Sequence, residues 1–258
     1  MRKFHRYTVL IFLVISFLLV GSVSAEQFPR PPRAPEGFVY VTDVIPDVIL
    51  DIRYYSTYNF LGTRVDMYLD PVAILEVRVA ERLKLAADKF RELGYVIKIF
   101  DTYRPQGAVD HFMRWGADTA DQKTKQYFYP DLDKATQIDP NVSNVYIAST
   151  SSHSRGTVVD FTLVNMKTGK ELNVGSKFDH FGRISDHRYG TGVNNWPVNE
   201  QPIITQEQKD NRAFLRQTMV DFGFSVYNAE WWHYSVAFTP TLPIRSFPNE
   251  LPLVTSWP

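Results

Sequence analysis

Hydrophobic and polar residues alternate with helical periodicity in three segments of the chain. Between residues 71 and 93 hydrophobic side chains recur every three or four positions, which predicts an amphipathic helix that begins at Pro71 and is ended by Gly94. The recurring positions are Leu75, Val79, Leu83, Ala87 and Phe90. Further helices are predicted over 106–115 and 206–222, the second closed by Gly223.

Strands are predicted where β-branched and aromatic residues concentrate: 39–52 (one or two short strands), 95–100, 157–164, 224–227 and 232–238. Residues 168–170, Thr-Gly-Lys, predict a hairpin turn, and the polar stretch 117–144 predicts a long loop with one short helix. Helices and strands are interleaved and joined by hairpins. This order predicts an α+β fold, a single domain with a central antiparallel sheet packed by helices.

The first 25 residues differ from the rest of the chain. Arg2, Lys3 and Arg6 precede an apolar run over 8–20, and small residues follow at 23–25. The apolar run is short for a membrane anchor, so residues 1–25 predict a cleaved secretory signal peptide and an exported protein, periplasmic or secreted. No membrane span is then expected in the mature chain. Residues 26–37 form a Pro-rich leader, and 241–258 form a Pro-rich C-terminal tail.

Composition restricts the chemistry that is available. The 258 residues include 28 Lys and Arg, 28 Asp and Glu, and no Cys. No basic block is present, so no nucleic-acid partner is expected. Without Cys the chain has no disulfide, no thiol nucleophile and no thiolate zinc site, so a metal site must use His, Asp, Glu and water. The sequence leaves the oligomeric state open.

Two short segments contain residues suited to metal binding. His153 lies in a Ser- and Gly-rich loop, and Asp160 follows within an apolar strand, where a carboxylate is costly to bury unless a cation or donors meet it. Glu230 and His233 lie in an aromatic segment. Residues three apart in a strand point to opposite faces, so they share a site only if the chain turns near Asn228. The alternatives are a salt-bridged Asp beside a loop His, and a core His.

Together His153, Asp160 and His233 form a set of two imidazoles and one carboxylate, which suits one Zn²⁺ per chain. Three ligands leave a fourth position for water, and zinc lowers the pKa of that water towards neutrality. Glu230 is then placed to act as general base. Arg104 follows the strand at 95–100 and is either a surface residue or a donor to the oxyanion of the transition state.

These segments resemble the zinc D,D-peptidases, the superfamily of D-alanyl-D-alanine carboxypeptidases, dipeptidases of the VanX type and hedgehog domains. The nearer resemblance is to the dipeptidases and runs from about residue 45 to 238. It rests on five segments in order: Asp51-Ile52-Arg53-Tyr54 with Asn59-Phe60, Asp101-Thr102-Tyr103-Arg104-Pro105, Ser151-Ser152-His153-Ser154-Arg155-Gly156, Gly175-Ser176-Lys177-Phe178-Asp179, and Glu230-Trp231-Trp232-His233-Tyr234.

The resemblance implies a hedgehog/D,D-peptidase-like fold, with residues 38–240 as a zinc D,D-dipeptidase domain. The implied reaction is hydrolysis of the small dipeptide D-alanyl-D-alanine to free D-alanine by a zinc-bound water, with Glu230 as the base. The resemblance also implies that Arg104 steadies the transition state. By the same resemblance, Asp179 would bind the free ammonium group of the dipeptide. Ser151 and Tyr54 would contact the substrate.

Two other functions share the same metal residues. A zinc D,D-carboxypeptidase would trim peptidoglycan stem peptides. Asp179 separates it from a dipeptidase, because a substrate whose amino end is blocked carries no ammonium group that needs a counter-charge. A non-enzymatic exported module would use zinc as a structural staple. That module has no need of Glu230 or Arg104. His180 and His187 are not expected to bind the metal, because three ligands complete the set.

Overall fold

The computed structural model describes residues 34–139, 146–192, 202–238 and 240–250. The predicted signal peptide 1–25, most of the Pro-rich leader, and the end of the C-terminal tail lie outside these ranges. Across the described ranges, none of the helices has both the length and the apolar character that crossing a membrane requires.

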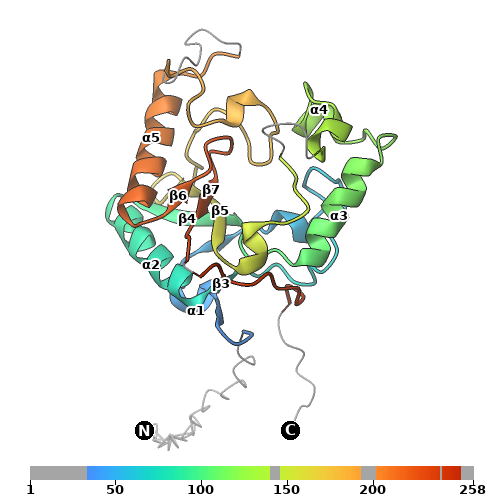
Figure 1. The fold of residues 1–258 in the computed structure, drawn as a ribbon. Coiled ribbons are helices and arrows are strands. Elements are labelled where there is room, and N and C mark those ends of the chain that lie inside the picture. Colours follow the sequence, from blue (N-terminus) through green and yellow to red (C-terminus); the bar gives the residue numbers. More distant parts are fainter. Residues whose placement is uncertain (1–33, 140–145, 193–201, 239, 251–258) are drawn as a thin grey trace, which may run out of the picture. The chain divides into compact units, whose positions relative to one another are not determined.

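A five-stranded sheet forms the centre of the fold, in the order β2-β4-β5-β7-β6. Neighbouring strands are antiparallel except at one edge, where β2 runs parallel to β4. The prediction of an α+β fold with a central antiparallel sheet (Figure 1) is therefore confirmed. The β2–β4 pair at its edge is parallel. The strands are β2 (Ile49–Leu50), β4 (Tyr95–Asp101), β5 (Val158–Asn165), β6 (Ser225–Val226) and β7 (His233–Ser235).

Two long helices, α2 (Val77–Glu92) and α5 (Gln206–Asp221), pack on one face of this sheet. The Phe90 ring of α2 lies 6.1 Å from Phe161 of β5 and 5.7 Å from Phe214 of α5, measured between ring centroids. Side chains alternate along a strand, so Phe161 and its neighbour Asp160 point to opposite faces. The helices thus bury the apolar face, and Asp160 lies on the other.

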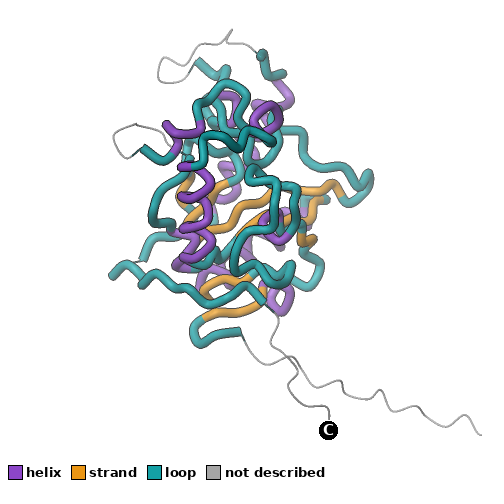
Figure 2. Tube along the Cα trace, turned by 90° about the vertical axis from the view of Figure 1, so that its right-hand side faces the viewer, coloured by secondary structure: helices purple, strands orange, loops and turns teal. Residues whose placement is uncertain are grey.

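The second face is covered by α3 (Gln106–Ala117), α4 (Lys125–Phe128) and long loops, which lie in front of the strands in Figure 2. Aromatic rings fill this layer: Phe112 of α3 lies 5.0 Å from Tyr54 and 4.9 Å from Phe60. Within the described residues, 3-10 turns interrupt the loops at Arg53–Tyr55, Lys134–Gln137, Ser152–Arg155 and Arg183–Ser185.

The predicted start of the first long helix at Pro71 is wrong. Ile74–Glu76 is a strand, β3, which pairs with β1 (Phe38–Tyr40) in a separate two-stranded sheet, and α2 begins at Val77. The Glu76 carboxylate accepts hydrogen bonds from the backbone N–H groups of Arg78 and Val79 and so caps the helix. Buried residues suit a strand as well as a helix, so periodicity could not place this boundary. Residues 39–52 also contain a short helix, α1 (Val41–Val44), which was not predicted.

The turns around the C-terminal strands agree with prediction. Glu230 N–H donates to the Tyr227 carbonyl at 3.1 Å and His233 N–H to the Glu230 carbonyl at 3.2 Å, so the chain does turn at 228–229. The strand that follows is shorter than the predicted 232–238. At the other hairpin, Asn165 N–H donates to the Lys170 carbonyl at 2.9 Å, and the predicted turn over 168–170 is confirmed. The loop 117–144 holds α4 and the 3-10 turn at Lys134–Gln137; residues 140–145 are outside the described ranges.

Arg212 of α5 anchors part of the segment that connects β5 to α5. Its side chain is buried, and its guanidinium donates to the carbonyls of Val174 at 2.6 Å, Asp186 at 2.8 Å and Ile184 at 2.7 Å. Few side chains other than Arg can satisfy three carbonyls in one plane. The segment 174–186, which includes Asp179, is therefore fixed to a rigid helix.

Candidate metal centre and substrate cavity

Three functional side chains lie in a row across three adjacent strands. Asp101 of β4 pairs with Asp160 of β5, and Asp160 pairs with His233 of β7. Directly opposed residues of antiparallel strands project from the same face, so the register brings these side chains together. A β-bulge between Ile99 and Asp101 shifts the register so that Asp101, rather than its neighbour, faces Asp160.

His153 reaches the same place from a 3-10 turn. The Ser151 hydroxyl caps this turn by accepting the His153 N–H at 3.2 Å. Gly156 ends it with φ of +70°, and an added Cβ there would collide with the Phe38 ring and approach the Glu76 nitrogen to 3.1 Å. His153 Nδ1 lies 2.6 Å from the Thr102 carbonyl oxygen. A carbonyl only accepts, so Nδ1 carries the proton and Nε2 keeps its lone pair for a metal.

The donor atoms fit one zinc ion. His153 Nε2 lies 3.4 Å from Asp160 Oδ2, and His233 Nδ1 lies 3.3 Å from Asp160 Oδ1. One donor atom from each of the three residues fits within 4.8 Å. Bonds of 2.0–2.1 Å in a tetrahedral site separate neighbouring ligands by about 3.3 Å. Asp160 Oδ1 is buried and accepts no well-aligned hydrogen bond from the described residues, as expected of an atom that binds a cation.

The charges of the centre are strongly coupled. Burial disfavours the protonated form of His233, yet the Asp160 and Glu230 carboxylates raise its pKa to about 9. Burial likewise disfavours ionised Asp160, but His153 and His233 hold its pKa well below the usual range. In the metal-free protein, a proton on His233 therefore balances the Asp160 charge. A metal ion must displace that proton to bind.

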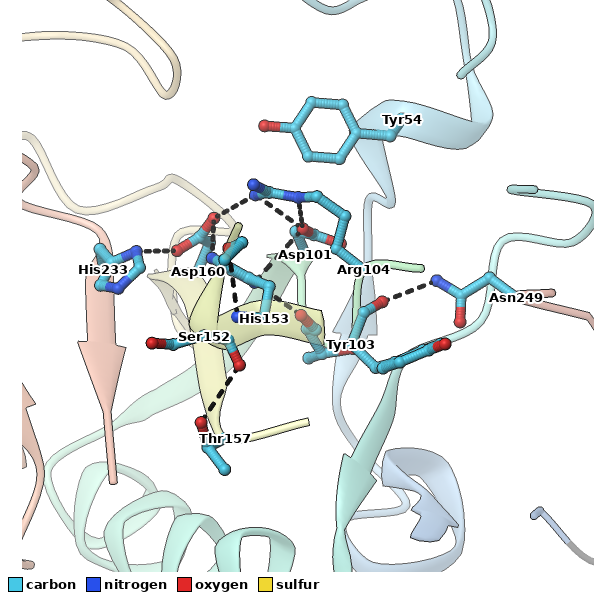
Figure 3. Close-up of polar contacts among 12 residues, drawn as sticks. Tyr54, Asp101, Tyr103, Arg104, Ser152, His153, Thr157, Asp160, His233 and Asn249 are labelled. Carbon is cyan, nitrogen blue, oxygen red and sulfur yellow. Dashed lines mark hydrogen bonds and ion pairs between the residues drawn. The ribbon is translucent and has the colours of Figure 1, made fainter. Parts of the chain in front are cut away.

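Glu230 and Arg104 flank the donor set without joining it. Glu230 Oε2 lies 3.4 Å from His233 Nδ1, and the turn at 228–229 brings it to the cavity wall. Arg104 Nε and Nη2 both lie 3.0 Å from Asp101 Oδ2, and Nη2 lies 3.7 Å from Asp160 Oδ2 (Figure 3). The guanidinium also lies 5.0 Å from the ring centroid of Tyr54. Arg104 is thus held at the centre, not exposed on the surface.

A cavity of about 270 Å³ extends from the metal centre to Asp179. The Tyr54 hydroxyl donates to Asp179 at 3.1 Å, and both side chains are buried. Burial raises the pKa of Asp179 well above its usual range, and the Asp160 and Glu230 carboxylates add to this effect. The structure brings every site residue predicted from sequence to this cavity wall: Tyr54, Arg104, Ser151, His153, Asp160, Asp179, Glu230 and His233.

Several residues of the site were not predicted. Asp101 is fully buried beside Arg104 and accepts a 2.6 Å hydrogen bond from the Tyr68 hydroxyl. An acidic residue at the end of an apolar strand, three positions before Arg104, was the signal that could have identified it. Tyr146 and Tyr227 also line the cavity. No pattern in the sequence marks these two. His180 and His187 lie outside the donor set, and His180 lines a different cavity.

Comparison with known proteins connects this geometry to a family. Residues 34–241 match the family model described as D-ala-D-ala dipeptidase. The D-alanyl-D-alanine dipeptidase of Enterococcus faecalis is 36% identical over 204 residues, which cover 79% of this chain and 93% of that protein. The D-alanyl-D-alanine dipeptidase of Enterococcus faecium is 35% identical over the same length, with the same coverage.

Among solved structures, a vancomycin resistance D,D-pentapeptidase, VanY, in complex with Zn(II) aligns with a TM-score of 0.32 and 18% identity. The alignment covers 66% of this chain and 76% of that one. A likeness this limited adds nothing to the description of the fold or the site.

The coupling around His233 predicts that zinc affinity depends on pH. Its pKa near 9 exceeds the usual value of 6.5, so the imidazole of the metal-free protein is protonated at neutral pH and becomes available to a metal as the pH rises towards 9. Zinc binding at pH 7 should release about one proton from this residue. Titration calorimetry in two buffers of different ionisation enthalpy measures this number. An affinity that stays constant from pH 6.5 to 8.5 would contradict the coupling.

Proposed function

The chain belongs to the D-Ala-D-Ala dipeptidase family, whose members are hydrolases, and we propose that it hydrolyses the free dipeptide D-alanyl-D-alanine to two molecules of D-alanine with zinc as its cofactor. The observation that carries this proposal is the buried Asp179 carboxyl group, which lines the same cavity as the metal ligands and has a tyrosine hydroxyl as its hydrogen-bond partner. Burial raises the pKa of Asp179 and so favours its neutral acid, which means that the ionised form needs a cation beside it. The ammonium group of a free dipeptide supplies one.

His153, Asp160 and His233 would hold the zinc ion, which when bound lowers the pKa of water and polarises a carbonyl group. Glu230 takes the proton from the attacking water and delivers it to the leaving nitrogen as the C–N bond breaks. Its position, 3.4 Å from His233 Nδ1 and on the cavity wall, supports this role. The oxygen of water ends in the new carboxyl group, and the proton ends on the released amine.

Arg104 would stabilise the negative charge that develops on the scissile carbonyl oxygen. Asp101 fixes the guanidinium from one side, and the rings of Tyr54 and Phe112 lie 5.0 Å from it. A donor that is already oriented does not have to reorganise during the reaction, which is the main source of electrostatic stabilisation in such sites. The Ser151 hydroxyl, also on the wall, would contact the substrate.

A D,D-carboxypeptidase acting on peptidoglycan stem peptides is the second candidate. Its substrates carry an acylated amino end without charge, and such a group placed at Asp179 would leave the buried carboxylate without a cation. A structural zinc module is the third. It has no use for a glutamate beside the metal or for an arginine held against the cavity. The cavity therefore favours the dipeptidase.

We also propose that the protein is exported. The support is the sequence of residues 1–25, a basic start followed by an apolar run and small residues. Export would place the enzyme where fragments of cell-wall peptide are released.

Replacing the proposed base should separate metal binding from catalysis. Glu230→Gln keeps the shape of the side chain but cannot accept a proton, so turnover of D-alanyl-D-alanine should fall about 10³-fold. Zinc content should stay at one ion per chain, because Glu230 is outside the donor set. Glu207→Gln, at an exposed position of α5, is the matched control and should keep full activity. A Glu230→Gln variant with wild-type turnover would refute the assigned base.

Removing the charge at the far end of the cavity tests the dipeptide assignment. Asp179→Asn should lower kcat/KM for free D-alanyl-D-alanine about 10²-fold, because the substrate ammonium loses its buried counter-charge. The wild-type protein should cleave N-acetyl-D-alanyl-D-alanine poorly. Rates of D-alanine release from both substrates provide the measurement, and Asp43→Asn, at an exposed position of α1, is the control for a lost negative charge. Equal cleavage of the acetylated substrate would favour the carboxypeptidase.

Export predicts a processed N-terminus. When the full chain is expressed in a bacterium, the mature protein should begin at Glu26, because the residues at 23–25 suit a signal peptidase. Intact-mass measurement of the protein recovered outside the cytoplasm checks this position. A full-length chain retained in the cytoplasm would argue against export.

A further inference from the structure

We propose that residues 242–250, here called the C-terminal strap, position Arg104 for catalysis. This inference rests on the function proposed above, in which Arg104 stabilises the transition state. The strap lies beyond residues 34–241, the part of the chain that matches the family model. None of its side chains lines the cavity. Its effect on the reaction must therefore pass through the residues that it contacts.

The main chain of Arg245 joins the two loops that meet at the metal centre. Its N–H donates to the Ser154 carbonyl at 2.7 Å, and its carbonyl accepts from the Gln106 N–H at 3.2 Å. Ser154 follows His153, and Gln106 lies two residues after Arg104. The loops also contact each other directly, since the Arg104 N–H donates to the His153 carbonyl at 3.3 Å. One strap residue thus closes a backbone link around Arg104 and His153.

Phe247 fixes the residue next to Arg104. Its ring stacks on Tyr103 with centroids 4.1 Å apart and an interplanar angle of 17°. The Tyr103 hydroxyl donates to the Phe247 carbonyl at 3.0 Å and accepts from the Phe247 N–H at 2.9 Å. Tyr103 is fully buried as a result. Its side chain is therefore tied to the strap at both of its hydrogen-bonding positions.

Asn249 contacts the backbone of Tyr103 itself. Its side chain is fully buried, and Nδ2 donates to the Tyr103 carbonyl at 3.0 Å (Figure 3). That carbonyl belongs to the peptide bond that leads into Arg104. This amide is consequently the strap's most direct side-chain contact with the backbone of the catalytic arginine.

The backbone of Asn249 also reaches the carboxylate that holds Arg104. Its N–H donates to the Met67 carbonyl at 2.8 Å, and its carbonyl accepts from the Leu69 N–H at 2.9 Å. Tyr68, between these two residues, donates through its hydroxyl to Asp101 Oδ1 at 2.6 Å. The other oxygen of Asp101 accepts from Arg104 Nε at 3.0 Å. The strap therefore supports Arg104 from its backbone and, through Tyr68 and Asp101, from its guanidinium.

Loss of the strap contact should reduce turnover and leave metal binding intact. A misplacement of about 1 Å at a catalytic group can cost about 10²-fold in rate, so Asn249→Ala should lower kcat for D-alanyl-D-alanine between about 10- and 100-fold. KM should change less than about threefold, because Arg104 acts mainly in the transition state. Zinc should remain at one ion per chain. Arg245→Ala is the control within the strap: the bonds of Arg245 described above are made by its main chain, so kcat should not change.

A double-mutant cycle with Arg104 separates positioning from a general loss of stability. If the strap acts through Arg104, Asn249→Ala should lower kcat less than about twofold in an Arg104→Ala background. If the kcat losses of Asn249→Ala and Arg104→Ala multiply in the double variant, or if Asn249→Ala loses zinc, the proposal is overturned. A chain shortened after Thr241 should show the same pattern as Asn249→Ala; if it does not fold, the point variant decides.

Hydrogen exchange provides a measurement that does not depend on activity. Asn249→Ala should raise the exchange rates of the backbone amides of Arg104 and Gln106, and exchange in α2 should stay unchanged. If the wild-type protein does not hydrolyse the dipeptide, the proposed function fails. The exchange pattern then tests by itself whether the strap holds the backbone at Arg104 in place. Unchanged exchange at Arg104 and Gln106 would refute the strap whether or not the protein is active.

Discussion

The buried carboxylate of Asp160 is the constraint on which the rest of the structure depends. It sits in the middle of the sheet with His153 and His233 on either side, and its exposed fraction is 2%. An ionised carboxylate cannot remain in such a place without a positive charge nearby. The two imidazoles meet this requirement only with a proton or a metal ion between them and the carboxylate. The Arg104 guanidinium, 3.7 Å from Asp160 Oδ2, supplies part of that charge, and a proton on His233 or a bound metal ion supplies the rest.

The same constraint explains which features could be predicted from the sequence. Asp160 interrupts an apolar strand, and no Cys offers an alternative ligand, so His and carboxylate donors were the remaining choice. The break at Asn228 was predictable because Glu230 and His233 could not otherwise share one side of the chain. Hydrophobic periodicity was enough for α2 and α5, although it placed the start of α2 six residues too early, at Pro71 instead of Val77.

Register and long-range contacts were beyond prediction. The bulge in β4 sets Asp101 opposite Asp160. The residue types at 99–101 do not indicate that this strand contains an extra residue. The link from Asn249 to Asp101 joins segments far apart in the chain. Backbone hydrogen bonds, which any residue except Pro can donate, hold Asn249 beside Met67 and Leu69, and the hydroxyl of the intervening Tyr68 then donates to Asp101. Such contacts leave little trace in composition or spacing. Candidate ligands can thus be identified from residue type, whereas the groups that orient them require the fold.

The position of His233 late in the chain determines when the metal site is completed during synthesis on the ribosome. A ribosome makes His153 and Asp160 well before His233, and makes the residues that brace Arg104 later still. A nascent chain that ends before β7 carries an incomplete ligand set and cannot retain zinc tightly. Hydrolytic competence therefore arrives late in synthesis, because the third metal ligand is made only when β7 is.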